Sequence, residues 1–181
     1  MPLIGPLLVA FGQWLKTTHL AELAVWLSTT PVSVAVNQSS WMTSTIQSFH
    51  IMAIAATFGA ALMVNLRILG LAGRSHPMAE IERRYTPWIW WGLLVLAVTG
   101  VVLVIAEPAR ELLNPCFWTK MVLIAGVALT NLWFQKSVRR SSALWEQADR
   151  GSIGIRVGAV VMIGVWCVIM VLGRWIAYFG I

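Results

Sequence analysis

The feature that most constrains this chain is one long, mostly apolar stretch, residues 44–72. Between Ile46 and Ala72 it holds a single basic residue, Arg67, and no acidic residue. A helix needs ~20 mostly apolar residues to cross a bilayer, so this stretch is long enough to span one. Its middle, residues 53–61, consists mainly of alanine, glycine and threonine. Small side chains let helix backbones approach closely in lipid, which predicts a central helix packed against its neighbours.

The composition of the whole chain also predicts a membrane environment. Hydrophobic residues make up 59% of the 181 residues and charged residues only 11%, against about 25% in a typical soluble domain. We therefore expect an all-α integral membrane protein without a soluble domain of useful size. The formal net charge of +6 does not predict nucleic-acid binding, because the basic residues lie beside or between the apolar stretches.

Three more apolar stretches follow the first one. Together they predict a four-helix bundle over residues 44–181, with spans at about 44–72, 87–106, 116–135 and 155–179. In this interpretation residues 73–86 form a basic loop and Pro87 occupies the first turn of the second span. Residues 107–115 form a short loop between the second and third spans.

The basic residues also predict the orientation in the membrane. Lysine and arginine are concentrated after the first span and after the third, at residues 73–86 and 136–153. The positive-inside rule places both loops in the cytoplasm. We therefore expect a bacterial inner-membrane protein with both termini in the periplasm and with Arg67 reaching the cytoplasmic headgroups. Most tryptophans fit interfacial belts, and Trp166, deep in the fourth span, is the exception.

Residues 1–43 form a separate outer interfacial segment in this interpretation. Polar side chains recur too often for a spanning helix, yet the apolar residues keep helical spacing. We expect residues 3–27 to be helical and to lie along the outer membrane interface. The side chains expected to be buried in that interface are Leu7, Phe11, Trp14 and Leu23. Residues 29–40 are expected to be a polar loop that leads into the first span.

Five polar side chains inside the spans are candidates for function. His50, Lys120 and Arg174 lie about one turn from the outer surface on three different spans. Asn65 and Asn131 lie in the cytoplasmic half, and Asn131 shares a helix face with Lys120. Polar groups inside a span are costly to bury, so they are retained mainly where they have a role. We expect these five residues to form a polar seam through the bundle.

The outer three residues predict a cofactor site. Neutral imidazole is a standard axial ligand of haem iron, which makes His50 a candidate metal ligand. Two flanking cations, Lys120 and Arg174, suit haem propionates, a quinone oxygen or a carboxylate substrate. A b-type cytochrome usually needs two ligands per haem, whereas the spans contain one histidine. The second ligand would come from His19, from a methionine thioether or from His50 of a second copy.

Simpler explanations lead to other functions. The two cations can extend to the interface or pair with Glu107 and Glu111. The asparagines can serve as interhelical hydrogen bonds, and His50 can do the same. Our main hypothesis is a small inner-membrane subunit that binds haem b or quinone for electron transfer, alone as a homo-oligomer or with other membrane subunits. The alternatives are a non-enzymatic anchor or assembly partner, and a carrier for a small anion or metal.

Four short motifs carry a resemblance to a known family. They are Asn65-Leu66-Arg67-Ile68-Leu69-Gly70 after His50, Thr86-Pro87-Trp88, Asn114-Pro115-x-Phe117-x-x-Lys120, and Gly173-Arg174-Trp175-Ile176-Ala177-Tyr178. Over residues 40–179 the chain resembles a bacterial group of four-span membrane proteins known only as a domain of unknown function. The resemblance implies four spans and marks His50, Lys120 and Arg174, and it brings no established activity. Many members of the group have Asp at position 65. A looser similarity is to b-type cytochromes and copper-resistance membrane proteins.

Overall fold

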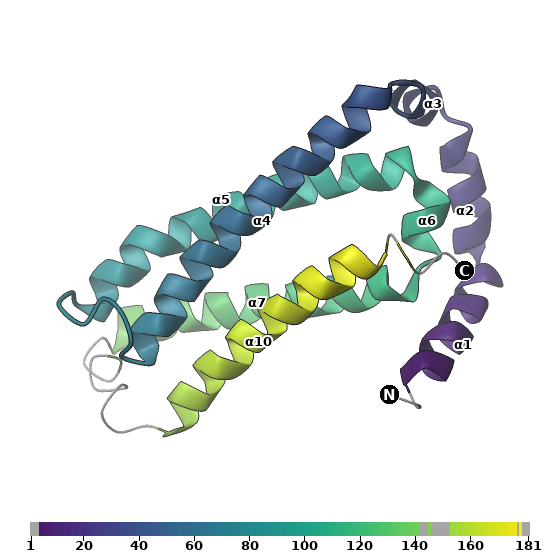
Figure 1. The fold of residues 1–181 in the computed structure, drawn as a ribbon. Helices are drawn as coiled ribbons and strands as arrows, with labels where there is room; N and C mark the ends of the chain where they lie inside the picture. The colour runs from purple at the N-terminus through teal and green to yellow at the C-terminus, as the bar shows by residue number, and fades with distance from the viewer. Residues whose placement is uncertain (1–3, 142–144, 146–152, 177, 179–181) are drawn as a thin grey trace. The chain divides into compact units, whose positions relative to one another are not determined.

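The computed structural model describes residues 4–141, 145, 153–176 and 178 of the chain, and these residues form helices joined by short connections (Figure 1). The helices are α1 (Ile4–Lys16), α2 (His19–Ser28), α3 (Pro31–Gln38), α4 (Ser40–Ile68), α5 (Met78–Ala106), α6 (Pro108–Leu112), α7 (Pro115–Arg140) and α10 (Ile153–Trp175). No strand occurs within the described ranges. The predicted all-α class is confirmed.

Four of these helices, α4, α5, α7 and α10, are long and apolar enough to cross a membrane. They contain 29, 29, 26 and 23 residues. The N-terminal helices α1, α2 and α3 contain only 13, 10 and 8 residues, too few to span the ~30 Å hydrocarbon core. The prediction of four spans is therefore confirmed, and the described part of the chain has no fifth one.

The second span begins earlier than the sequence predicted. Pro87 lies inside α5 rather than in its first turn, because the helix starts at Met78. An interior proline removes one backbone hydrogen bond, a loss that membrane helices tolerate. Met78 and Ile81 are buried and Tyr85 is partly buried against the same apolar cluster. This spacing of three and four residues is helical, and the loop interpretation overlooked it because charged residues stand between these positions.

Two more segments expected to be loops are helical. Within residues 29–40, α3 begins after Thr30, whose hydroxyl accepts a hydrogen bond from the backbone N–H of Ser33, and it has Pro31 in its first turn. Within residues 107–115, α6 begins at Pro108. Proline is favoured in the first turn of a helix, so both starts follow one rule.

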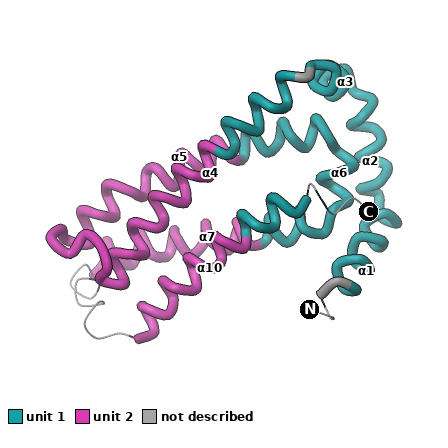
Figure 2. The backbone as a smooth tube through the Cα atoms, in the orientation of Figure 1, with its two compact units in different colours: residues 1–51, 97–122, 169–181 teal, residues 52–96, 123–168 magenta. Residues whose placement is uncertain are grey.

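The helices divide into two compact units (Figure 2). Unit 1 comprises residues 1–51, 97–122 and 169–181, and unit 2 comprises residues 52–96 and 123–168. In unit 2 all four long helices contribute to one apolar cluster: Val64 and Ile68, Met78 and Ile81, Phe134 and Val138, and Ala159. Unit 2 is thus a packed four-helix bundle.

The first span is the most buried of the four long helices. Of its most apolar window 39% is buried, against 17% for each of the other three. Within unit 2 its small residues Ala53, Thr57, Ala60 and Ala61 are buried. A Cβ added to Gly92 of α5 would lie 1.9 Å from Thr57 Oγ1, so the two backbones approach closely here. The small residues therefore act as predicted, by bringing helices together.

The end of α4 explains much of the Asn65–Gly70 motif. Gly70 has a φ of 70°, its N–H donates to the Arg67 carbonyl, and the Leu71 N–H donates to the Leu66 carbonyl. This is a Schellman motif, in which a left-handed residue closes the helix and satisfies its last carbonyls. The prediction that Arg67 reaches the headgroups is wrong. Arg67 is buried, and its Nε donates to the His76 carbonyl at 3.2 Å.

In unit 1 the short helices pack against the ends of the long helices. Ala24 of α2 packs in a cluster with Leu112 of α6, Phe117 of α7 and Ile176. The Asn37 amide on α3 donates to the Ala106 carbonyl at the end of α5. Leu7, Trp14 and Leu23 are exposed on the protein, and Phe11 stacks on Trp14 with ring centroids 5.8 Å apart. Their burial in a membrane interface stays a prediction.

Candidate functional site

His50 is held by a residue that the sequence interpretation did not consider. Its Nδ1 lies 2.7 Å from the Thr99 hydroxyl of α5, and its Cε1 lies 3.8 Å from where a Cβ on Gly100 would be. The ring is half-buried. Among the described residues the other ring nitrogen, Nε2, has no hydrogen-bond partner. Thr99 therefore fixes the ring orientation through Nδ1.

Lys120 lies close to His50 and to the end of α10. Its ammonium group is near enough to the His50 ring for the two to interact electrostatically. The same group lies 5.4 Å from the centre of the Phe117 ring, a favourable cation–π distance. Its aliphatic stem lies 3.9 Å from where a Cβ on Gly173 would be. The lysine stem therefore runs alongside α10 at Gly173.

Arg174 follows Gly173 but its side chain has a partner of its own. The guanidinium donates to the Tyr178 hydroxyl at 3.0 Å and lies 5.2 Å from the centre of the tyrosine ring. Arg174 is exposed. The structure therefore places Lys120 within electrostatic range of His50 and beside the backbone of α10, whereas the charged end of Arg174 contacts Tyr178.

The acidic residues of the α6 region do not neutralise the two cations by direct pairing. Glu107 pairs with Arg110. Glu111 interacts electrostatically with Lys120, but no carboxylate of the described residues forms an ion pair with Lys120 or Arg174. The alternative in which Lys120 and Arg174 pair with Glu107 and Glu111 is therefore not supported by ion pairs among the described residues.

Burial raises the pKa of Glu111 above its ordinary value of 4.5, although the charges of Lys120 and Arg110 oppose the shift. The folded state then holds the proton more tightly than the unfolded state. Its stabilising effect is present below pH 4.5 and is lost as pH rises through the raised pKa. We expect Glu111→Gln to lack this pH-dependent loss of stability. The melting temperature of the variant should therefore increase relative to that of the wild type as the pH rises from 4 to 8. Glu80→Gln, which removes an exposed carboxylate, is the matched control. Parallel pH profiles of wild type and Glu111→Gln would contradict the expectation.

Asn114 joins two of the matching motifs. Its Oδ1 accepts the Cys116 N–H at 2.9 Å and so caps α7. Its Nδ2 donates to the Ile176 carbonyl at 3.4 Å, just after α10. The motifs around residues 114–120 and 173–178 therefore meet in unit 1, where they position Lys120 relative to α10.

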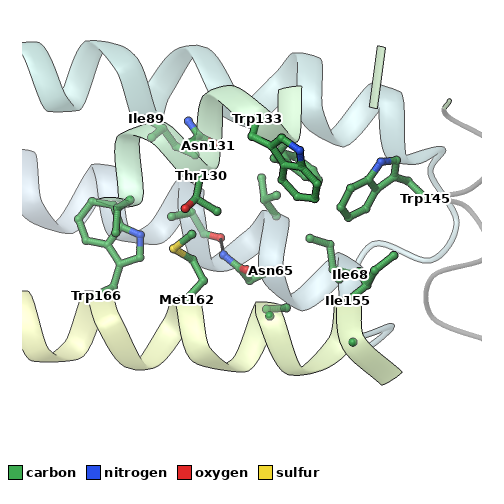
Figure 3. A pocket seen from close by; sticks show the side chains of 17 residues that line it. Asn65, Ile68, Ile89, Thr130, Asn131, Trp133, Trp145, Ile155, Met162 and Trp166 are labelled. Carbon is green, nitrogen blue, oxygen red and sulfur yellow. Dashed lines mark hydrogen bonds between the residues drawn. The ribbon is translucent and has the colours of Figure 1, made fainter. Parts of the chain in front are cut away.

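Asn65 and Asn131 belong to unit 2, where both line one cavity of about 360 Å³ (Figure 3). The Asn65 amide donates to the Ala61 carbonyl of its own helix at 2.8 Å. The Asn131 Nδ2 is buried and has no partner among the described residues. In the view of Figure 3 Asn131 lies beside Ile89 and Asn65 beside Met162. His50, Lys120 and Arg174 do not line this cavity.

The sequence interpretation missed the partners of the polar residues. Thr99 and Gly100 are unremarkable in an apolar span, and only the packing of α4 on α5 in unit 1 shows their role. The sequence did single out Trp166, because its position far from both predicted membrane interfaces is unusual for a tryptophan. It is buried, lines the cavity and packs near Phe58, with ring centroids 6.4 Å apart.

Metal binding by a cluster of side chains finds no support in the described ranges. No group of three or more His, Cys, Asp or Glu side chains in them could hold a metal ion. A haem needs only axial ligands from the protein, so this observation does not bear on His50 as a candidate axial ligand.

The fold and these sites define an all-α integral membrane protein whose polar residues of interest lie within its helices. The chain belongs to a family of unknown function, DUF6644, which matches residues 25–179. Comparisons with curated proteins and with solved structures found no match.

Proposed function

We propose that this chain is a small inner-membrane electron-transfer protein in which His50 and Lys120 bind a quinone, with haem b as the second candidate. One observation carries the proposal: Thr99 holds His50 Nδ1 at 2.7 Å, and Nε2 has no partner among the described residues. A histidine oriented through one ring nitrogen presents the other to a ligand. That nitrogen can donate to a quinone oxygen in one tautomer and ligate iron in the other.

The neighbourhood of His50 favours a quinone over haem. Lys120 supplies a positive charge close to the ring, which suits the negative charge that develops on a quinone oxygen as it is reduced. A haem would need a second axial ligand. In unit 1 His19 is exposed and lies 3.3 Å from Glu22, so it is already engaged elsewhere. A second copy of the chain, or a methionine, would then have to complete the haem site.

Absorption spectra and lipid extraction of the purified protein test the proposal. We expect quinone in the organic extract of the wild type and less than a tenth of it after His50→Ala. Thr99→Val, which keeps the shape of the side chain but removes the hydroxyl, should lower retention about tenfold. His19→Ala should change nothing. A Soret band that disappears in His50→Ala would assign haem b instead. A colourless protein that retains no quinone would reject electron transfer.

A non-enzymatic assembly partner is the second candidate function. Arg174 bonds to Tyr178 and the Lys120 ammonium lies over Phe117, so both cations have contacts within the chain. These contacts favour a structural role. A protein that retains no quinone or haem but co-purifies with a fixed set of membrane subunits would support this function and exclude the first.

The orientation in the inner membrane is part of the proposal. Exposed basic residues, Arg74, Arg83, Arg84, Arg139 and Arg140, lie near the end of α4, the start of α5 and the end of α7. The positive-inside rule then places the termini of this chain in the periplasm. A reporter enzyme that works only in the periplasm should be active when fused after Ile181 and inactive when inserted within residues 136–153. The reverse pattern would invert the topology and place the His50 site near the cytoplasm.

A further inference from the structure

The cavity of unit 2 has no part in the function proposed above. Its volume is about 360 Å³, which lies within the range of small-molecule sites. Residues of all four long helices line it, together with Trp145. Figure 3 shows three tryptophans around it, Trp133, Trp145 and Trp166, with Met162 between the helices.

Among the residues that the structure describes, the cavity lining carries no ionisable side chain. The 17 lining residues include no Asp, Glu, Lys, Arg or His. A charged ligand would therefore lose its hydration without gaining a partner of opposite charge. The occupant that fits is neutral and mostly apolar, because aromatic and aliphatic groups make most of the wall.

One polar group in the wall lacks a partner. The Asn131 Nδ2 is buried and makes no hydrogen bond within the described residues. Gln135, one turn further along α7, also has a buried Nε2 without such a partner. Buried amide donors are almost always satisfied, so an unsatisfied one beside a cavity points to an acceptor from outside the chain. Water alone suits the cavity poorly, because each buried water needs two to four polar partners.

The cavity can be reached from the lipid side. Thr130 and Trp133 of α7 and Gly154 and Gly158 of α10 line it and are exposed on the protein surface. A Cβ added to either glycine would meet no atom within 4 Å. The two glycines therefore leave open space at their positions on α10, and the outside of a spanning helix faces the bilayer.

We infer that this cavity binds a neutral, lipid-soluble molecule whose carbonyl oxygen accepts a hydrogen bond from the Asn131 amide. Its apolar body packs against Trp166 and the other aromatic side chains. The ligand enters from the bilayer past the two glycines of α10. Membrane quinones and acyl lipids both carry such an oxygen, and the experiment distinguishes them.

Photolabelling with 4-decylbenzophenone tests this inference on the full chain in lipid nanodiscs. The probe is a neutral, lipid-soluble ketone that attaches to nearby side chains when illuminated. We expect labelling in peptides that contain Met162 or Trp166. Asn131→Leu should lower this labelling about tenfold, the effect of one lost buried hydrogen bond. Gly158→Leu should lower it as much by filling the space. His50→Ala should leave it unchanged, which separates this site from the one proposed above.

Gly164→Leu is the matched control for Gly158→Leu. Gly164 lies on the same helix and also has no atom within 4 Å of an added Cβ, but it does not line the cavity. Displacement of the label by decylbenzoquinone would identify a quinone-type ligand, and displacement only by diacylglycerol an ester lipid. Labelling that survives both Asn131→Leu and Gly158→Leu, or that neither competitor displaces, would overturn the inference. Should Gly158→Leu fail to fold, Asn131→Leu decides alone.

Discussion

Replacing Gly92 with alanine is expected to destabilise the protein by about 2–3 kcal/mol, the upper part of the range for overpacked interiors. The added Cβ would lie 1.9 Å from Thr57 Oγ1, 3.0 Å from Thr57 Cβ and 3.4 Å from Thr57 Cα. Thr57 cannot rotate away cheaply, because it is fully buried and its hydroxyl donates to the Ala53 carbonyl at 2.6 Å. The backbones of α4 and α5 would therefore have to separate at this point.

Thermal unfolding in detergent measures this effect. Gly164→Ala on α10 is the control, because an added Cβ meets nothing within 4 Å there. We expect that control to be neutral or slightly stabilising, since alanine favours helix more than glycine does. Thr57→Ala combined with Gly92→Ala should recover part of the loss by removing the closest atom. A double variant as unstable as Gly92→Ala alone would show that Thr57 is not the obstacle.

Replacing Asn114 with leucine is expected to cost about 2–3 kcal/mol. The variant loses the cap of α7, worth ~1 kcal/mol, and leaves the buried Ile176 carbonyl without this donor, worth about 1–2 kcal/mol. Asn114→Ser separates the two contributions. Serine can still cap the helix but is too short to reach Ile176, so it should show about half the loss. A variant Asn114→Leu that melts like the wild type would refute this account of the motif.

Under the proposed function, Asn114→Leu should also weaken quinone binding at His50. The same asparagine holds the start of α7, which carries Lys120, against the end of α10. We expect quinone retention to fall in Asn114→Leu even at temperatures where the variant is still folded.

The four spans could be predicted because length and hydropathy alone decide whether a helix crosses a bilayer. The helix boundaries could not, because they depend on local rules that hydropathy ignores. The first two turns of α5 are rich in charged residues. Met78 and Ile81 nevertheless lie on one face of these turns and are buried in the core. The Thr30–Pro31 pair at the start of α3 indicates a helix N-terminus. The polar composition of the surrounding residues nevertheless favoured the prediction of a loop.

The depth of the candidate-site residues along their spans could be predicted, but their side-chain contacts could not. Counting residues along each span places His50 and Lys120 near one level, because each residue of a helix adds ~1.5 Å. Which side chains touch depends on how the helices rotate about their axes, and an apolar sequence leaves that rotation open. Thr99 as the partner of His50 is a result of packing. Arg174 lies in the last turn of α10 and Tyr178 in the turn that follows it, and their separation of four residues was a signal for this pair that the sequence offered.

The bond between Asn114 and the Ile176 carbonyl has a consequence for the order in which the protein is made. A chain emerges from the ribosome N-terminus first, so His50, Thr99 and Lys120 enter the membrane before α10 exists. Gly173 and Ile176, against which the start of α7 is held, arrive last. The surroundings of Lys120 are therefore complete only when the final helix has been inserted.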